Sequence, residues 1–166
     1  MKPPAPEFSR PLEVARVPQG GSYEKLQAAA EECVALAKRL GVETLRAYSG
    51  KLHVKPWRGG GLHVTGTMTA DLDRVSVVSL QSFATTQGIE IDRYFLPSGA
   101  ASGEEDDADP IEGGIVDLGE VAAETLALDL DPYPRQPGES FEVPSDSSPV
   151  SSSPFANLSK ILVKKP

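Results

Sequence analysis

Residues 109–135, DPIEGGIVDLGEVAAETLALDLDPYPR, constrain the fold most strongly, because several local signals agree there. Two adjacent glycines turn the chain into a short apolar strand. Asp117, followed three residues later by Glu120, has the pattern of a capping box and predicts a helix that begins near Leu118. Two X-Pro dipeptides follow. Because proline removes a backbone donor and restricts the residue before it, the helix should end by about Leu130.

The helix predicted over 118–130 has one apolar face. Val116 and Val121 occupy the two positions of a hydrophobic staple. The residues that recur at helical spacing on this face are Leu118, Val121, Ala122, Thr125 and Leu126. This face should pack on a sheet, and nothing in the stretch resembles a catalytic constellation.

A second helix is predicted over 22–40. Apolar residues keep helical spacing from Leu26 to Leu40, with Ser22 as the N-cap and Gly41 as the C-terminal stop. Upstream, alternation between residues 12 and 17 predicts a strand that enters from the Pro-rich amino end.

From residue 45 the apolar period changes to two, which is typical of half-buried strands. The clearest strand is 62–70, where apolar residues alternate with His63 and threonines, as in an antiparallel sheet with one wet face. Further strands are expected at 45–48, 51–55, 75–80 and 89–96. We therefore predict an α+β fold, in which an antiparallel sheet built from the amino strand and the 45–96 meander is covered by two main helices.

The 166-residue chain has room for one domain, which we place at 7–135. Within it, 98–109 is predicted to be a flexible acidic loop. Its row of four carboxylates lacks the intervening spacing of a calcium loop. The Pro/Ser-rich stretch 136–153 is predicted to be a disordered tether, since it cannot bury enough apolar area to fold alone.

The chain ends with a short motif at 154–166. Its apolar residues recur at helical spacing among three lysines, and they are Phe155, Leu158, Ile161 and Leu162. Two interpretations stay open: a recognition helix for a partner, or a segment that folds back to cover the sheet.

The net charge of −8 is unevenly divided. Residues 1–70 carry ten Lys/Arg and six Asp/Glu, a net +4, whereas residues 71–166 carry six and eighteen, a net −12. No apolar run approaches the roughly 20 residues that a membrane span needs, and the amino end lacks the apolar stretch of a signal peptide. We expect a cytoplasmic protein without membrane contact.

Few residues could support chemistry. Cys33 is the only cysteine, which excludes a disulfide or a cysteine-based zinc site within one chain and predicts a buried thiol. His53 and His63 lack a carboxylate spaced to complete a metal site, and Ser76 and Ser79 lack a general base. We predict no metal, no cofactor, no small-molecule substrate and no enzymatic activity.

The interval 46–58, RAYSGKLHVKPWR, interleaves cations with aromatic residues. The candidate RNA-binding residues are Arg46, Tyr48, Lys51, Lys55, Trp57 and Arg58. Cations hold phosphates and aromatic rings stack on unpaired bases, so this mixture suits RNA. A solvated strand face explains it equally well.

Three segments, in this order, resemble the YceD family, which is named for its role in large-subunit ribosomal RNA accumulation. VTGTMTADLDRVSVVSLQSF followed by IDRYFLP is similar to the family's central sheet. IVDLGEVAAETLALDLDPYPR is similar to its Asp-Leu helix with following prolines, and SPFANLSKI to its terminal Pro-Phe-Ala-x-Leu. The positions that carry this resemblance are Asp117, Leu118, Glu124, Leu126, Pro132, Pro134, Pro154, Phe155 and Leu158.

The resemblance implies a bacterial, non-enzymatic ribosome-biogenesis factor that supports accumulation or processing of large-subunit (23S) ribosomal RNA. Its partner would be that RNA or a basic ribosomal protein. The alternatives are an RNA-processing hydrolase or nuclease, and an adaptor that recruits another assembly factor. Ser76 and Ser79 stand where many members carry a Cys-x-x-Cys pair, so a metal or redox role of those members does not carry over.

Overall fold

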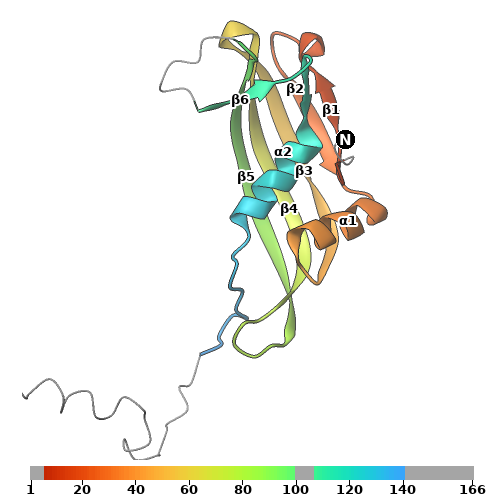
Figure 1. The fold of residues 1–166 in the computed structure, drawn as a ribbon, viewed down its shortest axis with the longest axis vertical. Helices are drawn as coiled ribbons and strands as arrows, with labels where there is room; N and C mark the ends of the chain where they lie inside the picture. Colours follow the sequence, from red (N-terminus) through yellow and green to blue (C-terminus); the bar gives the residue numbers. More distant parts are fainter. Residues whose placement is uncertain (1–5, 100–106, 141–166) are drawn as a thin grey trace, which may run out of the picture.

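The computed structural model describes residues 6–99 and 107–140, and it shows an α+β fold built on a curved five-stranded sheet (Figure 1). The sheet has the order β2-β3-β4-β5-β6, which are Ser22–Gln27, Thr44–Trp57, Gly61–Val75, Ser82–Pro97 and Ala108–Ile111. Strands β2 to β5 pair antiparallel, and β6 pairs parallel to β5. The predicted fold class, a largely antiparallel sheet with two main helices, is confirmed.

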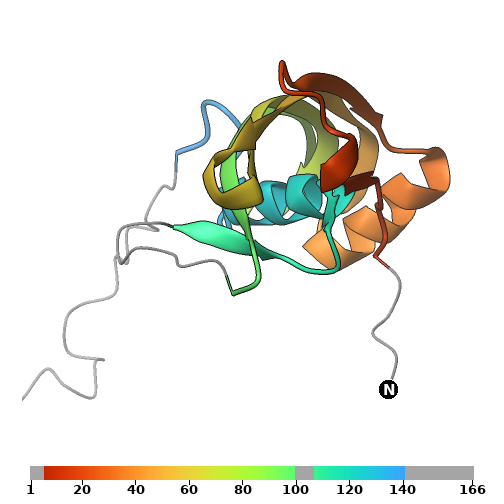
Figure 2. The ribbon, with the colours of Figure 1, turned by 90° about the horizontal axis from the view of Figure 1, so that it is seen from above.

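The three central strands are 14, 15 and 16 residues long, and they curl around helix α2, Leu118–Asp129 (Figure 2). Two glycines allow β3 and β4 to approach closely in this curl. A Cβ atom on Gly66 would lie 2.3 Å from the Lys51 carbonyl oxygen, and one on Gly50 would lie 2.2 Å from that of Thr67. Any side chain at these positions would force the strands apart.

Helix α2 lies in the hollow of the sheet, and its buried residues are Leu118, Gly119, Val121, Ala122, Ala123 and Leu126. Asp117 is its N-cap, as predicted, and accepts hydrogen bonds from the Gly119 and Glu120 amides at 3.0 and 3.2 Å. The other half of the expected capping box is absent, because the Glu120 carboxylate turns to Arg39 at 2.7 Å.

The helix predicted over 22–40 is wrong over residues 22–29. Residues 22–27 form β2, and α1 spans only Ala30–Leu40. Ser22 is not a cap, since its hydroxyl donates to Glu24. The start of α1 is instead fixed by Glu32, whose carboxylate accepts from the Ala29 amide at 2.7 Å. Its end at Gly41, in the left-handed conformation, is as predicted.

Four expected strands also differ. The 45–48 and 51–55 segments belong to one strand, β3, which has a bulge between Leu45 and Ala47. The expected strand 75–80 is mostly a turn, closed by a bond from the Ser76 amide to the Gln81 carbonyl. The amino strand is outside the main sheet: β1, Pro11–Glu13, pairs with β7, Ile115–Asp117, as a separate two-stranded sheet.

The ends of the expected flexible segments are also placed. Ala108 and Asp109, expected at the end of the acidic loop, belong to β6, where Asp109 pairs with Arg93. Residues 136–140 contact the β4–β5 turn through Glu139, whose carboxylate accepts from the Ser76 and Ser79 hydroxyls. The rest of the predicted tether and the motif at 154–166 lie outside the described residues.

Candidate nucleic-acid interface

The side of the sheet that faces away from α2 carries polar and aromatic side chains, because residues alternate between the two sides along each strand. On β3, Leu52 and Val54 are buried beneath the sheet, whereas Lys51 and Lys55 point outward and are exposed. The same alternation on β2, β4 and β5 makes one continuous outer face, with no helix on it in the described parts of the chain.

Two aromatic pairs stack across neighbouring strands of this face. Tyr23 on β2 lies opposite His53 on β3, with ring centroids 4.1 Å apart and ring planes 8° from parallel. His63 on β4 lies opposite Tyr94 on β5, at 4.1 Å and 4°. Trp57 also contacts Tyr94, at 4.8 Å and 52°. A band of five rings therefore crosses four strands.

Cations flank this band on the β2–β3 side. The Lys51 ammonium lies 4.4 Å from the centre of the Tyr23 ring, and the Arg58 guanidinium lies 4.7 Å from that of Trp57. Lys25 stands directly opposite Lys51 in the register. Like charges directly opposite each other destabilise a sheet, so this pair favours an anion between or above them.

The electrostatics of the two histidines differ. The pKa of His53 is lowered from its ordinary value, first by partial desolvation and then by repulsion from Lys55, His63 and Lys51. His63 instead has its Nε2 atom 2.7 Å from the Asp92 carboxylate on β5. The outer face is thus divided, with cations on β2 and β3 and carboxylates on β5.

The structure brings together four of the six residues predicted to bind RNA: Lys51, Lys55, Trp57 and Arg58. Arg46 is exposed, but it sits at the bulge and pairs with Asp73.

The sixth, Tyr48, does not belong to the outer face. Its side chain is 1 % exposed, and its hydroxyl donates to the Ala122 carbonyl at 2.8 Å. Burial raises its pKa. Tyr48 is a core residue that ties β3 to α2, so it cannot stack on a base.

Sequence reasoning missed Tyr23, Lys25, His53, His63 and Tyr94 as members of this surface. They come from four strands, and only the pairing register shows that they are neighbours. The alternation in 62–70 placed His63 on a polar side, but it could not name the residue opposite.

The positions that carry the family resemblance divide into four groups. Asp117, Leu118 and Leu126 cap and bury α2. Glu124 lies 3.9 Å from Arg93 at the surface. Pro132 and Pro134 line a hollow beside the β4–β5 turn. Pro154, Phe155 and Leu158 lie outside the described residues.

Within residues 6–99 and 107–140, no three His, Cys, Asp or Glu side chains are grouped so that they could hold a metal ion. Cys33 is buried, as predicted. No helix in these same ranges is long and apolar enough to cross a membrane. Comparison with protein-family models, with curated proteins and with solved structures finds no match.

Proposed function

We propose that this protein is a non-enzymatic factor that binds single-stranded RNA on the outer face of its sheet, and that it thereby supports accumulation or processing of large-subunit ribosomal RNA. The observation that carries the proposal is the band of five rings flanked by lysines on β2 and β3. Proteins that bind single strands combine these same two elements: cations along the backbone and rings for the bases.

The separation of cations on β2 and β3 from carboxylates on β5 favours one orientation of the RNA strand on the outer face. Phosphates are attracted to Lys25, Lys51 and Lys55 and repelled by the carboxylates of β5. The bases then extend toward Trp57 and Tyr94. Carboxylates accept hydrogen bonds from exocyclic amino groups of bases, a role open to the β5 carboxylates beside the rings. Bases must be unpaired to reach these groups, which is why a single strand is favoured over a duplex.

The ribosomal target rests on the resemblance of three segments to the YceD family. Cells that lack the protein should therefore contain less large-subunit ribosomal RNA. A second candidate, an adaptor for a basic ribosomal protein, is favoured by the outward Glu90 and Asp92 on β5 and by the net −12 of residues 71–166.

Fluorescence anisotropy with a labelled single-stranded RNA tests the proposal. The double variant Lys51→Glu, Lys55→Glu should bind more weakly whatever the RNA sequence. Its slope of log Kd against log salt should fall by about 0.7 for each phosphate that the variant no longer neutralises. The matched control is Lys38→Glu, Arg135→Glu, which changes the net charge equally at exposed positions on α1 and after α2.

Aromatic stacking is tested separately. Trp57→Ala should cost about 1 to 3 kcal/mol of binding free energy if its ring stacks on a base. Tyr133→Ala is the control, because Tyr133 is an exposed aromatic residue after α2. Equal losses in both variants, or equal losses in the two charge-reversal variants, would show that the outer face is not the binding surface.

The alternatives have distinct outcomes. In an affinity pull-down from lysate, recovery of a ribosomal protein after RNase treatment would favour the adaptor. RNA cleavage by the purified protein that is abolished by His63→Gln would favour a nuclease, since His63 and Asp92 form the one histidine–carboxylate pair found in the described ranges.

A further inference from the structure

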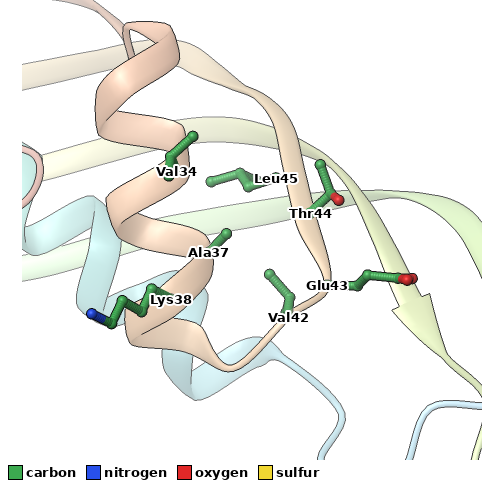
Figure 3. A pocket seen from close by; sticks show the side chains of 7 residues that line it. All are labelled: Val34, Ala37, Lys38, Val42, Glu43, Thr44 and Leu45. Carbon is green, nitrogen blue, oxygen red and sulfur yellow. The ribbon is translucent and has the colours of Figure 1, made fainter.

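An apolar groove lies between α1 and the start of β3 (Figure 3). Val34 and Ala37 line it from the helix, and Val42 and Leu45 line it from the chain that follows. Lys38, Glu43 and Thr44 complete the lining. The groove is open on one side and has a volume of about 310 Å³. Val34 is 72 % exposed, an unusual position for a valine beside other apolar side chains.

The groove continues into a second hollow of about 400 Å³, because Val42 and Glu43 line both. The second hollow is completed by Gly41, by Arg74 and Val75 at the end of β4, by Val77 in the β4–β5 turn and by two prolines after α2. Both valines are more than two-fifths exposed. A surface with exposed valines and a few charged side chains therefore runs from α1 to the β4–β5 turn.

The described chain ends next to this surface. After α2 it runs along the β4–β5 turn, where the Val77 amide donates to the Pro134 carbonyl at 2.9 Å. Glu139 then binds the Ser76 and Ser79 hydroxyls of the same turn, and its pKa is lowered by these two hydrogen bonds. The residues that precede the carboxy-terminal segment are thus held at one end of this surface.

We propose that residues 155–162 of this same chain dock in the groove between α1 and β3. The segment presents Phe155, Leu158, Ile161 and Leu162 at helical spacing. These positions, i, i+3, i+6 and i+7, lie on one side of a helix, as in an amphipathic helix that fills an apolar groove. The proposal concerns the side of the molecule that carries α1, and it does not depend on RNA binding to the outer face of the sheet.

Chain length and charge support this occupant. Residues 141–154 connect the anchor at Glu139 to the segment, and a flexible chain of that length spans about 20 Å on average. A tether of this kind gives a local concentration in the millimolar range. Residues 154–166 carry three lysines and no acidic residue, whereas the whole chain carries −8. Glu43, which lines both hollows, supplies an opposite charge for one of these lysines, whereas Lys38 in the lining of the groove repels a lysine placed beside it.

Hydrogen exchange of the full-length protein tests the docking from both sides. A contact with a Kd of about 0.1 mM, at an effective concentration of about 1 mM, should slow exchange of the 155–162 amides about tenfold. Val34→Lys should abolish this protection and leave exchange in β4 and β5 unchanged. Leu158→Asp with Ile161→Asp should in turn speed exchange of residues 34–45.

Leu128→Lys is the matched control, because Leu128 is an exposed leucine, 82 % accessible, that does not line the groove. It should leave the 155–162 amides protected. The proposal is overturned if these amides exchange at unprotected rates in the wild type, or if Val34→Lys leaves their protection unchanged. It is also overturned if the protection grows with protein concentration, because the occupant is then the segment of a second copy.

Discussion

Tyr48→Phe tests whether Tyr48 contributes to the stability of the core or to RNA binding on the outer face. The substitution keeps the buried ring and removes only the hydroxyl, which donates to the Ala122 carbonyl of α2 at 2.8 Å. A typical intramolecular hydrogen bond contributes about 1 kcal/mol, and a buried carbonyl left without this partner adds to the loss. We expect the free energy of unfolding to fall by about 1 to 2 kcal/mol, at an unchanged affinity for RNA.

Urea denaturation followed by circular dichroism measures the first quantity, and anisotropy measures the second. Trp57→Ala provides the reverse case, in which RNA affinity falls and stability changes less, because Trp57 lies on the outer face. Unchanged stability in Tyr48→Phe would refute the hydrogen bond to α2. A loss of RNA affinity at unchanged stability would show that Tyr48 meets RNA and that its burial is wrong.

Three further variants test the fold and the face. Leu126→Asp should destabilise the domain by several kcal/mol, because it places a charge at a fully buried position, whereas Leu128→Asp on the same helix should not. Asp117→Ala should cost about 1 to 2 kcal/mol in urea denaturation, since it removes the cap of α2. The lowered pKa of His53 keeps it neutral at pH 7. RNA phosphates favour its protonation, so anisotropy should show affinity rising as pH falls from 7 and His53 gains a proton, and His53→Gln should flatten this rise.

The sequence predicted α2 well because its signals are local. Asp117 caps the helix through the two amides that follow it, and the apolar face of α2 needs no partner to be recognised. The error in 22–40 has the opposite origin. Leu26 is buried in either a strand or a helix, so its spacing to Leu40 favoured one long helix. Residues 22–27 form a strand because they pair with β3, and the pattern within 22–40 does not show this long-range contact.

Only the part of the candidate site that lies on β3 could be predicted from the sequence, again because its signal is local. Period-two alternation on β3 places Lys51, Lys55 and Trp57 together, and it also places Tyr48 with buried Leu52, so the mistake about Tyr48 was avoidable. The cross-strand partners were not available in this way. Tyr23 and Tyr94 are 71 positions apart, and only the curled sheet brings both to one band of rings.

The opposed Lys25 and Lys51 allow a test in which stability and binding move in opposite directions. Directly opposite like charges destabilise a sheet, and opposite charges contribute about 0.2 to 1 kcal/mol. Lys25→Glu should therefore raise the free energy of unfolding and weaken RNA binding. Lys25→Gln should produce about half of the gain in stability and about half of the loss in RNA binding free energy. Lys51 is not the position to change, because its ammonium also lies over the Tyr23 ring.

Both effects should shrink in high salt, since exposed charges are screened within about 10 Å at 0.1 M ionic strength. Denaturation at low and high salt, paired with anisotropy, measures them. If Lys25→Glu lowers stability, the two lysines do not repel each other in the free protein. If it raises stability without weakening RNA binding, the repulsion is real but no RNA phosphate relieves it. RNA binding explains why two lysines stand opposed at a cost in stability only if Lys25→Glu both raises the free energy of unfolding and weakens RNA binding.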